Sequence, residues 1–170
     1  MTDPAITETI DIALRNGARV APVAPGQKVP ALNAWQREAS ADPTRIDAWW
    51  NGSHRGHGVC IVTGTRTTDG RCLFVVDIDV KGNGFDTLDE LVRTHGQLPD
   101  TLTTLTPSGG AHLFFVAPEG VEIRNNQSGK IGPGLDIRGE GGQVIAAPSV
   151  HPNGERYEWE LSSPLDAADA

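Results

Sequence analysis

Cysteine is scarce in this sequence, and long apolar runs are absent. The 170 residues include only Cys60 and Cys72 and no CxxC pair, which argues against a disulfide framework or a zinc module built from cysteine pairs. Each cysteine lies in an apolar stretch, so we expect both to be buried like small hydrophobic side chains. No stretch approaches the roughly 20 apolar residues of a membrane span, and no charged-then-apolar signal pattern opens the chain. These absences favour a cytoplasmic protein with no membrane partner, and the length suits one domain.

Excess positive charge is also absent, since the formal net charge is −8 at pH 7. Contact with phosphates depends on Lys and Arg, so this balance argues against a general polyanion binder. An acidic protein can still handle nucleic acid if its carboxylates hold metal and a local basic patch faces the phosphates. We expect such a patch to be small, with Lys28, Arg37 and Arg55 as candidates.

Three helices are indicated by capping residues and by apolar spacing. Asp3-Pro4 opens the first, which ends at Gly17, and Asp42-Pro43 opens the second, which ends at Gly52. The third is expected from about residue 85 to 95. Trp49 and Trp50 in the second helix are expected to lie in the core.

Strands are expected over most of the remaining sequence, separated by turn signals such as Asp69-Gly70. The expected strands are 58–64, 72–80, 101–106, 112–116, 135–138, 142–147 and 156–160. Helices interleave with strands in the first half, and strands follow one another in the second. This order predicts an α+β domain with a mixed sheet covered by helices. We expect the domain to span residues 1–161 and residues 162–170 to be a linker or a disordered C-terminal end.

The strand expected to end near residue 80 carries two carboxylates. Alternation places Asp77 and Asp79 on one face, opposite Phe74, Val76 and Ile78. Two neighbouring carboxylates repel each other unless a cation lies between them, and hard divalent cations prefer oxygen ligands. Asp-x-Asp by itself is a weak signal, because acids also end strands at the surface.

Two further segments carry polar side chains in a strand context. In the turn Ser108-Gly109-Gly110, backbone N–H groups can face an anion, and His112 opens the strand that follows. Asp136 and Arg138 share a face of a later strand. They can form a simple ion pair, or Asp136 can complete a metal site while Arg138 neutralises phosphate charge.

Taken in order, these segments resemble the primase-polymerase family of the archaeo-eukaryotic primase superfamily, described as bifunctional DNA primase/polymerase, over nearly the whole chain. The resemblance rests on Val75-Val-Asp-Ile-Asp79, Thr106-Pro-Ser-Gly-Gly-Ala-His112, Leu135-Asp-Ile-Arg-Gly139, Pro148-Ser149 and His151-Pro-Asn-Gly-Glu-Arg-Tyr-Glu-Trp159. In the N-terminal half it rests on Gly26-Gln-Lys-Val-Pro30, Trp35, Asp42, Trp49-Trp50 and Val62-Thr-Gly64.

The resemblance implies an RRM-like sheet fused to an N-terminal α/β unit, the catalytic core of archaeo-eukaryotic primases. It implies that Asp77, Asp79 and Asp136 are the catalytic and metal-binding acids, with Mg²⁺ or Mn²⁺ as cofactor, and that His112 contacts the nucleotide. Lys28, Ser108 and Arg138 correspond more loosely to nucleotide-contacting positions, together with the Gly109-Gly110 backbone. Some relatives carry an inserted zinc element, a helical domain or a helicase, for which this chain has neither the cysteines nor the length.

The expected function is therefore metal-dependent, template-directed nucleotide addition to a 3′-hydroxyl. The substrates would be a dNTP or NTP and a single-stranded or primed DNA template, with a helicase or a C-terminal accessory domain as a possible partner. Two alternatives stay open. One is a catalytically silent nucleotide- or DNA-binding module acting with a helicase, and the other is a metal-dependent nuclease or phosphohydrolase that uses the same acids with water as nucleophile.

Overall fold

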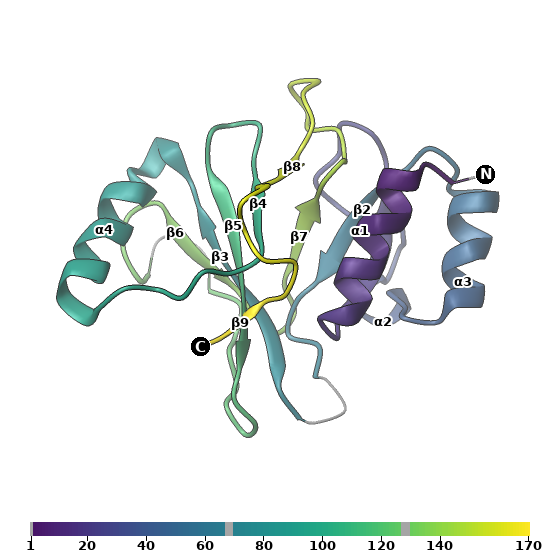
Figure 1. Cartoon of the computed structure of the whole chain (residues 1–170). Coiled ribbons are helices and arrows are strands. Elements are labelled where there is room, and N and C mark those ends of the chain that lie inside the picture. Colours follow the sequence, from purple (N-terminus) through teal and green to yellow (C-terminus); the bar gives the residue numbers. More distant parts are fainter. Residues whose placement is uncertain (1, 67–69, 127–129) are drawn as a thin grey trace.

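The protein is an α+β domain in which two β-sheets pack together and helices cover their outer sides. The computed structural model describes residues 2–66, 70–126 and 130–170 (Figure 1). The α+β class is confirmed, but the sheet expected to be single is divided in two. The Asp69-Gly70 turn signal lies partly outside the described residues.

The three expected helices are present, and the first two begin at their predicted caps. Asp3 and Asp42 each accept a hydrogen bond from the backbone N–H two residues further on, and proline follows each of them. Trp49 and Trp50, 7% and 2% exposed, lie in the core as expected. The helical elements are α1 (Pro4–Arg15), α2 (Trp35–Glu38), α3 (Pro43–Ala48), η1 (Trp49–Ser53), η2 (Val80–Gly82) and α4 (Gly84–His95).

The smaller sheet has the order β1-β2-β7 and the larger sheet the order β6-β3-β5-β4-β8, each with antiparallel neighbours. A further short strand, β9, pairs in parallel with β5. The strands are β1 (Arg19–Val23), β2 (Gly58–Val62), β3 (Cys72–Ile78), β4 (Thr103–Leu105), β5 (Ala111–Ala117), β6 (Leu135–Arg138), β7 (Gln143–Ala146), β8 (Glu158–Trp159) and β9 (Ala168–Asp169). The seven expected strands are present, whereas β1 and β9 were not expected.

The main hydrophobic core lies between the two sheets and beneath α1. It includes Ile61 of β2, Val75 of β3 and Phe114 of β5, with apolar side chains of α1 and η1. We call the face of the larger sheet that joins this core its inner face. α4 lies over the opposite face (Figure 1). Its Leu88 and Leu91 pack against a small cluster of buried side chains from β3, β5 and β6.

The C-terminal segment 162–170, expected to be a linker or a disordered end, contains β9. Leu102 N donates to Asp166 O, and Ala170 N donates to Val116 O at 3.0 Å, so these last residues pair with the larger sheet. Both cysteines are buried and free, as expected. Among the helices in the described part of the chain, none combines the length and apolar character that crossing a membrane requires.

Candidate active site

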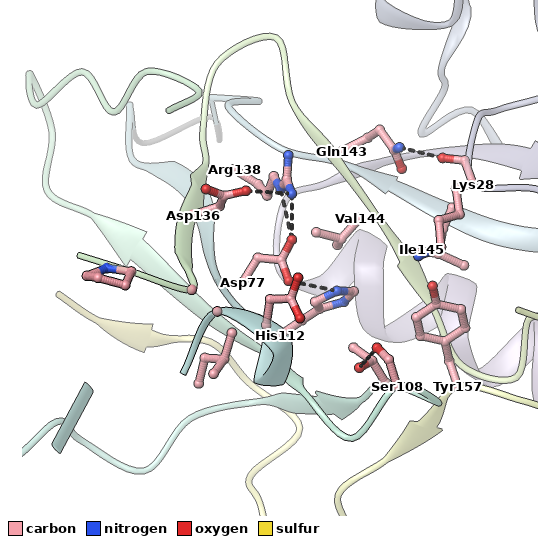
Figure 2. Close-up of a pocket in the computed structure, with 16 residues that line it drawn as sticks. Lys28, Asp77, Ser108, His112, Asp136, Arg138, Gln143, Val144, Ile145 and Tyr157 are labelled. Atoms are coloured by element: carbon pink, nitrogen blue, oxygen red, sulfur yellow. Dashed lines mark hydrogen bonds and ion pairs between the residues drawn. The ribbon is translucent and has the colours of Figure 1, made fainter. Parts of the chain in front are cut away.

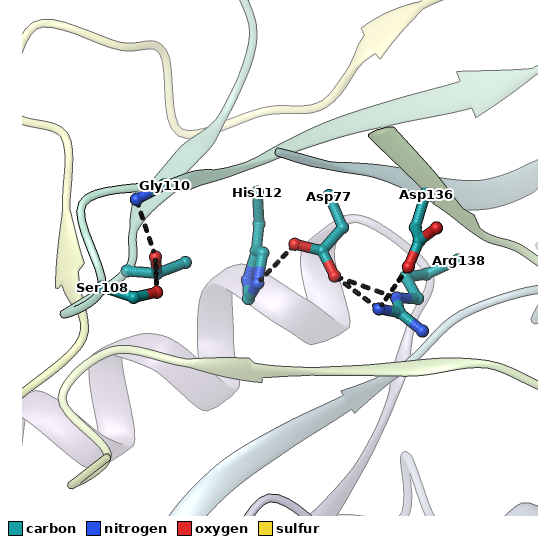
Figure 3. A network of polar contacts seen from close by, with 7 residues as sticks. Asp77, Ser108, Gly110, His112, Asp136 and Arg138 are labelled. Atoms are coloured by element: carbon teal, nitrogen blue, oxygen red, sulfur yellow. Dashed lines mark hydrogen bonds and ion pairs between the residues drawn. The ribbon is translucent and has the colours of Figure 1, made fainter. Parts of the chain in front are cut away.

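Four polar side chains form one row across the inner face of the larger sheet. Asp77 of β3 lies directly opposite Asp136 of β6 on one side and His112 of β5 on the other. Thr104 of β4 lies opposite His112 and continues the row. Because residues paired across antiparallel strands project to the same face, their side chains point together toward the smaller sheet. Figure 3 shows Asp136, Asp77 and His112 side by side on neighbouring strands.

The row opens into a cavity of about 690 Å³ between the larger sheet and β7. Its lining side chains include Asp77, Asp79, Asp136, Lys28, Ser108, His112 and Arg138, which the sequence analysis proposed, together with Gln143, Val144, Ile145 and Tyr157, which it did not (Figure 2). Gln143 Nε2 donates to Lys28 O at 2.9 Å and so ties the loop that carries Lys28 to β7. Seven of the nine proposed site residues therefore face one cavity, and Gly109 and Gly110 do not line it.

Arg138 connects the two carboxylates of the row. Its Nη2 donates to Asp77 Oδ2 at 2.6 Å and to Asp136 Oδ2 at 3.1 Å, and its Nε donates to Asp77 Oδ2 at 3.0 Å. The three side chains are between 20% and 25% exposed, so water screens these contacts only in part. The ion pair within β6, one of the two alternatives for Asp136 and Arg138, exists, but the shorter contacts of the guanidinium are to Asp77 on the neighbouring strand.

His112 is the most buried ionisable side chain of the row. Its Nε2 lies 3.6 Å from Asp77 Oδ1, longer than a hydrogen bond. Burial lowers the pKa of His112 below its usual 6.5; the charge of Arg138 lowers it too, and Asp77 opposes the change. A lowered pKa leaves the imidazole neutral at pH 7, so one ring nitrogen of His112 donates a hydrogen bond and the other accepts one.

Tyr157 closes the cavity beside His112, with ring centroids 6.0 Å apart and planes at 30°. Burial, and then the charge of Asp77, raises the pKa of Tyr157 to about 12, so its hydroxyl stays protonated at neutral pH. Tyr157 was expected only as part of a family-like segment, because nothing near it in sequence shows that its ring meets His112.

Asp79 lies beyond the end of β3 rather than within it. The expected strand continued to residue 80, but it ends at Ile78, and Asp79 Oδ1 accepts from Lys81 N at 2.9 Å to open η2. Val80 is consequently 44% exposed instead of sharing the buried face of the strand. Asp79 N also donates to Gly134 O at 2.8 Å, which fixes the backbone of this turn next to the start of β6.

Three glycines allow that close approach between the two turns. A Cβ on Gly134, which has φ +73°, would lie 2.5 Å from Gly84 N, and a Cβ on Gly82 would lie 2.5 Å from Gly134 Cα. These distances are too short for any side chain, so Asp79 reaches the cavity because the backbones of two turns are in direct contact.

The Ser108-Gly109-Gly110 turn is closed by its own hydrogen bonds. Gly109 N donates to Thr106 O at 2.9 Å and Gly110 N donates to Thr106 Oγ1 at 3.0 Å (Figure 3). Both N–H groups were expected to face an anion, but each donates its hydrogen bond to Thr106 within the turn. Ser108 is the member of the turn that lines the cavity, with its Oγ 3.1 Å from Thr106 Oγ1.

A metal site formed by Asp77, Asp79 and Asp136 was expected from the sequence. Within residues 2–66, 70–126 and 130–170, no three His, Cys, Asp or Glu side chains are grouped closely enough to hold a metal ion. Two of the three expected ligands do converge, because one nitrogen of Arg138 lies within 3.1 Å of both Asp77 and Asp136. Carboxylate oxygens are the ligands that Mg²⁺ and Mn²⁺ prefer. The donor types therefore fit a hard divalent ion, and a guanidinium lies where Asp77 and Asp136 meet.

An α+β domain whose cavity aligns carboxylates, an imidazole and a guanidinium has the residues that phosphoryl-transfer chemistry uses. Comparison with family models makes the assignment: the chain matches the bifunctional DNA primase/polymerase, N-terminal, model over residues 10–170. The protein belongs to this family, Prim-Pol, as its sequence motifs indicated. The comparison with curated proteins found no match.

Proposed function

We propose that this domain catalyses metal-dependent, template-directed transfer of a nucleotide to a 3′-hydroxyl. The observation that supports this best is the Asp136–Asp77–His112 row with Arg138, which lines a single cavity in a member of the primase/polymerase family. The description of the larger sheet as RRM-like, with an N-terminal α/β unit, belongs to the same proposal.

Asp77, Asp79 and Asp136 are the residues that would hold Mg²⁺ or Mn²⁺. When bound, such an ion supplies Lewis-acid stabilisation of the phosphate oxygens and favours the ionised 3′-hydroxyl. Arg138 can turn from the carboxylates to the triphosphate, because a guanidinium pairs equally well with phosphate. The 3′-oxygen forms a bond to the α-phosphorus while the bond from that phosphorus to the bridging oxygen breaks, and pyrophosphate leaves without a covalent protein intermediate.

The remaining cavity residues would bind the nucleotide. Neutral His112 donates one hydrogen bond to a phosphate oxygen, and Ser108 Oγ offers another donor on the same side of the cavity. Lys28, exposed on its loop, would supply positive charge to the cavity that it lines. Under this proposal the domain uses a dNTP or NTP and a single-stranded or primed DNA template, and a helicase or an accessory domain can act with it.

A primer-extension assay with Mg²⁺ or Mn²⁺ tests the proposal. Asp77→Asn and Asp136→Asn should each abolish elongation and pyrophosphate release, since each removes an oxygen ligand while preserving shape. Asp89→Asn is the matched control, because Asp89 is an exposed acid of α4 away from this cavity. Shortened oligonucleotides without elongation would instead identify a nuclease, and metal-dependent dNTP binding without either reaction would identify a silent binding module.

A further inference from the structure

A second cavity, of about 420 Å³, lies beside the first and has the opposite charge character. Its lining residues are Thr2, Asp3, Ile6, Pro25, Trp50, Arg55, Gly56, His57, Gly58, Pro148, Ser149, Val150 and Arg156. Two arginines face it against one carboxylate, whereas the first cavity has three carboxylates against one lysine and one arginine. In a chain of net charge −8, this is a local concentration of positive charge, which suits an anion without a metal.

The two arginines are held differently. Among the residues that the structure describes, Arg55 has no hydrogen-bond or ion-pair partner, and it is exposed within the 54–57 turn. Arg156 donates one hydrogen bond from Nη1 to Pro148 O at 2.8 Å, which leaves its other N–H groups available. The one acid, Asp3, already accepts from Ala5 N at the start of α1, so it caps a helix rather than pairing with either arginine.

One polar atom of the residues that line this cavity has no hydrogen-bond partner in the described part of the chain. His57 Nδ1 is buried without a hydrogen-bond partner among the described residues, while the His57 backbone carbonyl accepts from Trp50 Nε1 at 3.0 Å. Buried polar atoms are usually hydrogen-bonded, but this atom is covered by its neighbours. The donors that face the cavity are therefore those of Arg55 and Arg156, which come from two separate segments.

Two segments of the chain contribute residues to both cavities. Gly26 N donates to Val150 O at 3.0 Å, which joins the 24–28 loop to the 148–157 segment. Along the loop, Pro25 lines the second cavity and Lys28 the first. Along the other segment, Arg156 lines the second and its neighbour Tyr157 the first, because successive residues of an extended chain project to opposite sides. A nucleic-acid strand carries a phosphate at every nucleotide, which makes it the candidate ligand for a basic cavity that shares two segments with the first cavity.

We propose that Arg55 and Arg156 bind a backbone phosphate of the nucleic-acid strand whose reactive end or template base lies in the first cavity. The identity of the strand rests on the proposed function, whereas the anion site rests on the second cavity alone. The expected patch of Lys28, Arg37 and Arg55 is thereby divided: Lys28 and Arg55 face adjacent cavities, and Arg37, exposed on α2, lines neither.

The test is the salt dependence of binding of a short, labelled single-stranded oligonucleotide, measured in EDTA without nucleotides. Each phosphate contact to a single strand contributes about 0.7 to the slope of log K against log salt. Arg55→Ala and Arg156→Ala should each reduce the slope by about 0.7, so the advantage of the unmodified protein shrinks about 2.6-fold between about 50 and 200 mM salt. Arg55→Lys should keep the slope, because it preserves the charge, and Arg37→Ala is the matched control.

Unchanged slopes in both alanine variants, or an equal reduction in Arg37→Ala, would overturn the proposal. If Arg156→Ala disturbs the fold, judged by circular dichroism, Arg55→Ala decides alone, since Arg55 has no described partner to lose. Inorganic pyrophosphate distinguishes the source of the anion: variants that lose stabilisation by pyrophosphate but bind the oligonucleotide with an unchanged slope would show a site for free anions, against the strand assignment. Asp136→Asn should keep the slope, so a failure of the proposed chemistry remains separate from a failure of this site.

Discussion

Arg138 is the residue whose removal tests the site most directly. Arg138→Met keeps the length of the side chain but removes three hydrogen bonds to Asp77 and Asp136. The two carboxylates then face each other across paired strands, about three-quarters buried, without the guanidinium between them. Both the lost hydrogen bonds and the new repulsion destabilise the metal-free protein.

The size of this effect follows from the partial burial. Hydrogen bonds to charged groups contribute about 1.5–3 kcal/mol, and breaking a fully buried ion pair costs about 3–5 kcal/mol. Because these side chains are 20–25% exposed, we expect a loss of about 2 kcal/mol. For a chain of this size that corresponds to a fall in Tm of about 4–8 °C.

The assay is thermal unfolding in EDTA and then in Mg²⁺ or Mn²⁺. A divalent ion should stabilise Arg138→Met more than the unmodified protein, because it binds carboxylates that no guanidinium occupies. Adding Asp136→Asn to Arg138→Met should recover part of the loss, since it removes one of the two repelling charges. Arg124→Met is the control, because it breaks an exposed ion pair with Glu122 and should leave Tm nearly unchanged. If Arg138→Met and Arg124→Met melt alike in EDTA, the electrostatic account of the row is wrong.

Three further outcomes are expected. Gly134→Ala should lower stability by about 2–3 kcal/mol and abolish extension, because a Cβ would meet Gly84 N at 2.5 Å and φ is +73°; a stable, active variant would show that the turns can separate. Tyr157→Phe should flatten the loss of stability at high pH: the Tyr157 pKa of about 12 lies above its ordinary 10.0, so the folded state keeps its proton while the unfolded state ionises, and stability falls by about 1 kcal/mol as pH rises from 10 to 11. If the free energy of unfolding, measured by urea denaturation, falls equally with pH from 10 to 11 in Tyr157→Phe and in the unmodified protein, this prediction is wrong. The isolated chain should extend primers but start them weakly or not at all, because starting requires two nucleotides and a template without a duplex; efficient primer synthesis on single-stranded template by this chain alone would refute this.

The sequence predicted the elements whose signals are local. Caps and proline fixed the starts of α1 and α3, and alternation placed Asp77 opposite Val76 and Ile78. β1 was missed because Pro22 argues against a strand, yet proline is tolerated at a sheet edge, and β1 pairs with β2 alone among the named strands of its sheet. The division into two sheets was not predicted, because strand pairing depends on contacts between residues far apart in sequence.

The candidate site shows the same limit at the level of single residues. Sharing a strand face suggested that Arg138 pairs with Asp136, and that contact exists at 3.1 Å. The shorter contact, 2.6 Å to Asp77, depends on the register between β3 and β6, which sets Asp77 beside Asp136 and Val75 beside Arg138. That register places one guanidinium against both carboxylates at once. Under the proposed function, the cation that stabilises the metal-free row would compete with a metal for the same carboxylates, so metal binding and the release of Arg138 toward a triphosphate are expected to be coupled.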